Sequence, residues 1–154
     1  MINEPGLYIG IGMVLSLFLT ETLGVTAGGI IVPGYIAMNL DDPYRIIITF
    51  SISIIVYLII KLLSKFILIY GKRRLVLALL LGFLLGYFTR YENNIFPILN
   101  VEDYIVIGNI IPGLIANWMD RQGVLRTICT ILITSGITKL FIMTLTVYQI
   151  ISIQ

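Results

Sequence analysis

Two uncharged runs set the architecture of this chain: residues 24–40 read GVTAGGIIVPGYIAMNL, and residues 105–119 read IVIGNIIPGLIANWM. Each run carries a Pro-Gly pair near its middle. Proline fixes φ and lacks an N–H, so it interrupts a helix or occupies the first turn of a new one. We therefore expect a break in each run, followed by a half-helix over residues 34–40 and 113–119.

Four longer apolar stretches surround these runs, over residues 7–20, 46–70, 75–89 and 127–153. A helix needs about 20 apolar residues to cross a bilayer. The chain of 154 residues is 58% hydrophobic and only 12% charged, with a mean hydropathy of +1.03. Typical soluble domains carry about 25% charged residues. The sequence therefore predicts one all-α integral membrane domain, with four long transmembrane helices and two broken segments, over residues 1–154.

The composition excludes several classes of function. The chain has no His and a single Cys, Cys129, so it lacks the commonest metal ligand and any disulfide framework. Ten basic residues nearly balance eight acidic ones, which argues against nucleic-acid binding. We find no acid pair spaced for acid–base chemistry and no phosphate-binding loop. We expect no catalytic residue, no metal site and no cofactor in this chain.

The two runs resemble each other. Residues 29–37 (GIIVPGYIA) align with residues 108–116 (GNIIPGLIA), with six of nine positions identical at an offset of 79. A weaker match joins residues 12–16 to residues 82–86. We interpret the chain as two internal repeats, approximately residues 1–74 and 75–154. Many transporters consist of two such repeats, and their substrate-binding site lies where the paired broken helices meet.

Charge placement gives a topology. Five of the ten basic residues fall between positions 61 and 74, and no acid occurs from position 43 to position 91. The turn at residues 71–74 is therefore expected in the cytoplasm. Re-entrant runs would give four spans with both termini in the cytoplasm, and crossing runs would give six spans. From the sequence we favour the re-entrant arrangement.

The broken segments suggest an anion path. Free N–H groups at a helix start, together with the helix dipole, attract carboxylates and phosphates. Lys139 lies deep in a predicted span, where an unpaired charge is energetically costly. We therefore expect Lys139 to have an acidic partner such as Glu21, to line an aqueous cavity, or to reach one face of the membrane. The alternative to an anion site is that the breaks only kink helices that pack against their neighbours. The candidate path-lining residues are Pro33, Gly34, Tyr35, Asn39, Pro112, Gly113, Asn117 and Lys139.

A second candidate site is the basic turn. Its residues are Lys65, Lys72, Arg73 and Arg74. They could bind anionic lipid, receive an acidic partner, or simply set the topology.

Three motifs resemble the PgsC/CapC family, the membrane subunits of poly-γ-glutamate (capsule) synthase. The first is TETLG at residues 20–24 followed by GIIVPGY at residues 29–35. The second is LSKFILIYGKRR at residues 63–74. The third is IIPGLIAN at residues 110–117, followed by Gln122-Gly123. The motifs occur in one order, and the resemblance covers nearly the whole chain.

This resemblance implies a multi-pass protein of the bacterial cell membrane and a set of partners. These are a cytoplasmic Mur-ligase-like amide ligase, a membrane-anchored extracellular accessory subunit, the poly-γ-glutamate polymer, membrane lipids and further copies of the chain. ATP and a divalent metal would belong to the ligase, and this chain would be a non-catalytic subunit. It would support the ligase and polymer translocation. A non-conducting scaffold for the ligase and a stand-alone small-anion transporter are the alternatives.

Overall fold

The computed structural model describes residues 5–66, 71–95 and 107–153, and in these ranges the chain forms helices joined by short connections. The last four residues of the predicted span 46–70 and the first two of the run 105–119 lie outside these ranges. The helices are α1 (Pro5–Leu23), α2 (Val32–Met38), α3 (Pro43–Phe66), α4 (Lys72–Ile95), α5 (Ile111–Gln122) and α6 (Val124–Ile153).

Three of these helices are long and apolar enough to cross a membrane. The qualifying stretches are Pro5–Thr22 in α1, Pro43–Lys65 in α3 and Val124–Tyr148 in α6. The fourth predicted span, residues 75–89, lies within α4, where three basic residues precede it. Its role as a span remains a prediction.

The two prolines stand in the first turns of the short helices. Pro33 follows Val32 at the start of α2, and Pro112 follows Ile111 at the start of α5. Both helices therefore begin two residues before the expected half-helices. α2 ends at Met38, before the expected residue 40, whereas α5 continues to Gln122, beyond residue 119. The glycine that follows, Gly123, has φ +93° and separates α5 from α6.

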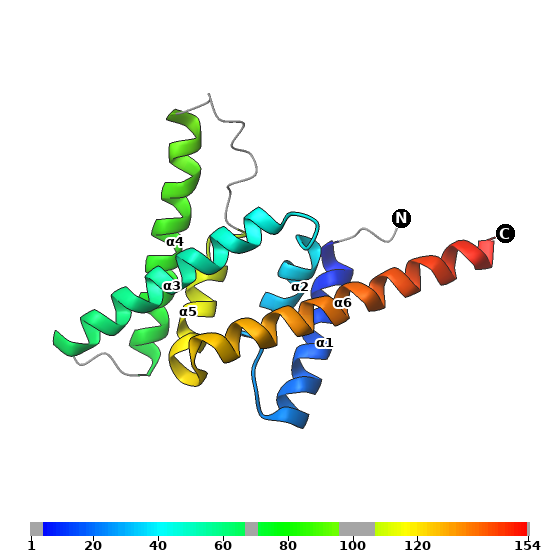
Figure 1. The fold of residues 1–154 in the computed structure, drawn as a ribbon, viewed down its shortest axis with the longest axis horizontal. Coiled ribbons are helices and arrows are strands. Elements are labelled where there is room, and N and C mark those ends of the chain that lie inside the picture. Colours follow the sequence, from blue (N-terminus) through cyan, green and yellow to red (C-terminus); the bar gives the residue numbers. More distant parts are fainter. Residues whose placement is uncertain (1–4, 67–70, 96–106, 154) are drawn as a thin grey trace.

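Each short helix packs between helices of both halves. α2 contacts α1 and α6, while α5 contacts α4 and α3. Figure 1 shows α1 and α4 on either side of this pair, with α3 and α6 crossing the others. α1 also contacts α6, as α4 contacts α3, so the pairings of one half have counterparts in the other.

Glycines allow the short helices to approach their neighbours closely. A Cβ on Gly12 would lie 2.6 Å from the Cα of Gly34, and a Cβ on Gly82 would lie 2.8 Å from the Cα of Gly113. Such distances leave no room for a side chain. The pairs Gly12–Gly34 and Gly82–Gly113 join the same parts of the two halves that the sequence aligns.

The second broken segment runs in one direction beside α4. Asn109 lies against Gly86, Gly113 lies against Leu79 and Gly82, and Asp120 pairs with Arg74. The segment thus follows the predicted span 75–89 from near one end to the other without turning back. In the first half, Gly29 accepts a hydrogen bond from Ser16, and Gly34 lies against Ile9 and Gly12. Within the described residues this segment does not fold back on itself as a re-entrant hairpin would, and the number of membrane crossings stays a prediction.

Candidate functional site

The two breaks meet at a cavity of about 230 Å³. Its walls come from the start of α2, the start of α5 and the three residues before α5. The lining residues are Ile31, Tyr35, Gly108, Asn109, Ile110, Ile111 and Leu114. Of the predicted path residues, only Tyr35 is among them. The walls are mostly aliphatic, so the polar atoms of Tyr35 and Asn109 are the groups that can give the cavity selectivity.

Asn109 is the lining residue that the sequence analysis missed. Its side-chain Oδ1 is buried and accepts no hydrogen bond within the described part of the chain. Buried polar atoms are nearly always paired, so an unpaired carboxamide oxygen beside a cavity needs an explanation. A signal was present in the sequence, because Asn109 stands opposite the apolar Ile30 in the repeat and is one of two asparagines, with Asn117, in its apolar run.

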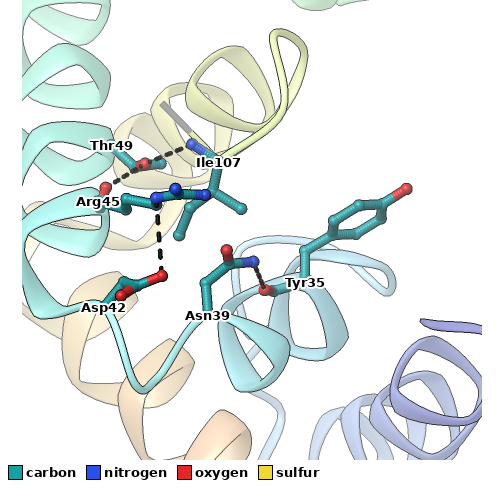
Figure 2. Close-up of polar contacts among 6 residues, drawn as sticks. All are labelled: Tyr35, Asn39, Asp42, Arg45, Thr49 and Ile107. Carbon is teal, nitrogen blue, oxygen red and sulfur yellow. Dashed lines mark hydrogen bonds and ion pairs between the residues drawn. The ribbon is translucent and has the colours of Figure 1, made fainter. Parts of the chain in front are cut away.

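Tyr35 and Asn39 are linked on α2. The Asn39 side-chain amide donates to the backbone carbonyl of Tyr35 over 2.9 Å, as Figure 2 shows, while the Tyr35 ring points away from this contact. Beside them, the Ile107 N–H donates to Thr49 Oγ1 over 3.1 Å and ties the second broken segment to α3. Arg45 and Asp42 form an ion pair of 3.7 Å at the start of α3.

The Pro-Gly residues are buried rather than open to the cavity. Pro33 and Gly34 pack against α1, and Pro112 and Gly113 pack against α4. The backbone nitrogen of Gly113 would be 2.5 Å from a Cβ on Gly82, so it faces the neighbouring helix. The geometry therefore gives these residues a role in close helix packing, and their role in anion binding remains a prediction.

Asn117 and Lys139 lie away from the cavity lining. Asn117 is 4% exposed on α5. Lys139 Nζ donates to Asp41 Oδ1 over 2.5 Å, and its side chain is 13% exposed. The acid that pairs with Lys139 is thus Asp41, in the α2–α3 connection, and not Glu21. This contact holds α6 to the connection between α2 and α3.

The predicted basic turn divides into two kinds of residue. Lys65, Lys72 and Arg73 are exposed. Arg74 is half-buried and forms an ion pair with Asp120 of α5. Burial lowers the pKa of the Arg74 guanidinium, and the charge of Arg121 lowers it further, while Tyr57 raises it. Arg74 therefore acts as a structural link, which leaves Lys65, Lys72 and Arg73 available to a partner.

Gln122 fastens the first broken segment to the end of α5. Its Nε2 donates to the Thr26 carbonyl over 2.6 Å and to Thr127 Oγ1 over 3.1 Å. Its Oε1 accepts from the Thr26 N–H over 3.3 Å. Arg121 lies over the Trp118 ring, 5.3 Å from its centre. The connection after α1 and the α5–α6 junction therefore lie at the same end of the molecule.

Comparisons with known proteins agree on one family. Residues 11–128 match the model of the family described as "Capsule biosynthesis CapC". The chain is similar to a capsule biosynthesis protein CapC of Bacillus anthracis, with 37% identity over 135 residues, 86% of this chain and 90% of that protein. It is also similar to a PGA biosynthesis protein CapC of Bacillus subtilis (strain 168), with 36% identity over the same shares. No solved structure matches.

Proposed function

The chain belongs to the CapC family of capsule biosynthesis proteins, and from this premise we propose that it is the membrane subunit of a poly-γ-glutamate synthase and export complex. The family places it in capsule or PGA biosynthesis. In the proposed role it supports a cytoplasmic ATP-dependent amide ligase and lets the growing polymer cross the cell membrane. The ligase carries the ATP and divalent metal, and a membrane-anchored extracellular subunit assists outside.

The proposed topology has six crossings, made of two inverted repeats. Three observations support it: the matching glycine contacts of the two halves, the packing of α2 and of α5 between one helix of each half, and the course of the second broken segment along α4. With the turn at residues 71–74 in the cytoplasm, both chain ends then lie outside. In Figure 1 the start of α1 and the end of α6 lie higher than the start of α4, as this topology requires.

The observation that best supports the proposal is a concentration of basic residues at one end of the molecule. Seven of the ten basic residues belong to the end of α3, the start of α4 and the α5–α6 junction: Lys61, Lys65, Lys72, Arg73, Arg74, Arg121 and Arg126. In the proposed topology this basic end faces the cytoplasm, where the ligase and its polyanionic product are. A cytoplasmic face of this sign attracts both an acidic partner surface and a chain of carboxylates.

The test reverses the charges of the exposed residues Lys72 and Arg73. It leaves Arg74 unchanged, because Arg74 forms the ion pair with Asp120. In the double variant Lys72→Glu, Arg73→Glu, we expect the protein to insert normally and polymer output to fall at least about tenfold, because two attractions become repulsions. The control is Lys72→Gln, Arg73→Gln, which removes charge without reversing it and should have a smaller effect. Polymer is measured in cells that carry the complete synthase. Normal output from the Glu variant, at normal membrane levels, would remove the docking role.

Translocation is separated from scaffolding in vesicles. Ligase reconstituted with this chain should deliver polymer to the far side of the bilayer, where a degrading enzyme can reach it. Ligase bound to vesicles by an unrelated membrane anchor should make polymer without delivering it. Equal delivery from both preparations would establish a scaffold in place of a conduit.

A further inference from the structure

The last turns of α3 present two lysines beside an exposed apolar surface. Leu58 is 50% exposed and Leu62 is 57% exposed, and both lie within the part of α3 that is apolar enough to cross a membrane. Lys61 and Lys65 are exposed on the same side of the helix, since side chains three and four residues apart are neighbours. In a membrane, this surface therefore places two positive charges next to acyl chains.

The depth of these lysines in the membrane decides which partner they can meet. The stretch Pro43–Lys65 has 23 residues, so as a helix it is about 35 Å long, close to the thickness of the hydrocarbon core. Lys65 therefore lies at the membrane boundary, and Lys61 lies about 6 Å deeper. Both predicted topologies place this end of α3 at the cytoplasmic leaflet, because it adjoins the turn at residues 71–74. A soluble protein does not reach Lys61 at that depth, whereas a phospholipid headgroup does.

A tyrosine of the same helix holds the Lys61 ammonium in place. Lys61 Nζ donates to Tyr57 Oη over 3.2 Å and lies 5.4 Å from the centre of the ring. The Tyr57 ring packs against the buried core, so the position of this pair is fixed before any ligand arrives. Within the described ranges, no carboxylate pairs with Lys61 or Lys65. In that part of the chain, two N–H groups of Lys61 and the O–H of Tyr57 remain to donate to an acceptor.

We propose that an anionic phospholipid of the cytoplasmic leaflet binds at this end of α3. Its phosphate accepts hydrogen bonds from the Lys61 ammonium and the Tyr57 hydroxyl, and its acyl chains cover the two exposed leucines. Lys65 adds a second positive charge at the level of the headgroup. Hydrogen bonds from an ammonium to a phosphate are charge-assisted and therefore strong. The site prefers anionic to zwitterionic lipid, because a zwitterionic headgroup brings a cation of its own toward two lysines.

The preference for anionic lipid is tested by titrating the purified full chain, in detergent, with single phospholipids. Phosphatidylglycerol is the anionic probe, phosphatidylcholine is the zwitterionic reference, and native mass spectrometry counts the bound lipids. The first phosphatidylglycerol should bind at least about tenfold more tightly than the first phosphatidylcholine, because each of the two lysines favours an anionic lipid about fivefold. Equal affinities for the two lipids would overturn the proposal.

Single substitutions test the position of the site. Lys61→Gln should weaken phosphatidylglycerol binding about fivefold and leave phosphatidylcholine binding unchanged, whereas Lys61→Arg keeps the charge and should retain most of the affinity. Tyr57→Phe keeps the packed ring and loses only the hydroxyl, so it should weaken phosphatidylglycerol binding roughly 2- to 10-fold.

Arg126→Gln is the matched control, because it removes an exposed positive charge from α6 at the same end of the molecule. It should change the affinity for phosphatidylglycerol less than about twofold, since Arg126 lies outside the face formed by α3. Equal losses in Lys61→Gln and Arg126→Gln would show a diffuse attraction in place of a site and would overturn the proposal. The chain is titrated without the ligase, so the outcome does not depend on the proposed function.

Discussion

At the scale of single residues, four glycines determine how closely the broken segments approach the long helices. Gly12 and Gly34 meet in the first half, and Gly82 and Gly113 meet in the second, each at a separation that excludes a Cβ atom. In a membrane, where lipid tails are as apolar as the helices, such close van der Waals contact is a main source of association. These glycines therefore allow α2 to pack closely against α1 and α5 to pack closely against α4.

We predict that Gly82→Ala destabilises the protein by about 1–3 kcal/mol, the usual cost of forcing a group into a packed site. The new Cβ would lie 2.5 Å from the Gly113 backbone nitrogen, which cannot move without shifting α5. Gly136→Ala on α6 is the matched control, because no heavy atom lies within 4 Å of its Cβ position. That control should be neutral, or stabilising by up to about 1 kcal/mol. Thermal unfolding in detergent measures both, and equal midpoints would contradict the packing role.

The Lys139–Asp41 pair gives a second prediction at this scale. Lys139 is 13% exposed and Asp41 is 82% exposed, so loss of the acid leaves a largely buried ammonium without its partner. Asp41→Asn should cost about 1 kcal/mol, the upper end for pairs with one exposed member. In the Lys139→Leu background the same change should cost nothing further. A double-mutant cycle on unfolding free energies measures this coupling, and additive effects would show that the two side chains act independently.

At the scale of elements, the sequence predicted where the helices break, but not which residues from distant parts of the chain lie around the breaks. Proline and glycine chemistry is local, so the starts of α2 and α5 were found within two residues. The identity of Lys139's partner was missed because it depends on the α2–α3 connection folding back onto α6, which is a long-range contact. Asn109 was missed for the same reason, since its unpaired oxygen is evident only once α2 and α5 are brought together.

The hydrogen bonds of Gln122 predict that the end of α5 restrains the connection between α1 and α2. Gln122→Ala removes the hydrogen bonds that hold Thr26, which lies outside any helix, to the end of α5. We expect backbone hydrogen exchange over residues 24–31 to speed up about tenfold or more, because each lost bond to a constrained loop is worth about 1 kcal/mol. Thr130→Ala is the control, since its hydroxyl bonds only to Arg126 of its own helix. Unchanged exchange in the Gln122 variant would mean that other contacts hold the segment.

At the scale of the whole molecule, charge and chain direction lead to the same orientation. Three connections, α1–α2, α3–α4 and α5–α6, lie at one end of the molecule. They are joined there by the ion pair between Arg74 and Asp120 and by the hydrogen bonds between Gln122 and Thr26. This end holds seven of the ten basic residues, which is the bias that the positive-inside rule associates with the cytoplasm. A four-span arrangement would instead place Arg121 and Arg126 outside, against that bias. The distribution of charge thus favours six crossings independently of the course of the backbone.

Labelling of single cysteines distinguishes the two topologies, because they place the α5–α6 junction on opposite sides. In the Cys129→Ala background, Leu125→Cys reports on this junction, and Leu125 is 80% exposed. Lys72→Cys is cytoplasmic in both topologies and Asp42→Cys is outside in both, so these two positions calibrate the assay. We expect a membrane-impermeant maleimide added to intact cells to label position 42 and to spare positions 72 and 125. Labelling of position 125 from outside would restore the four-span arrangement, and the repeats could then not be inverted with respect to each other.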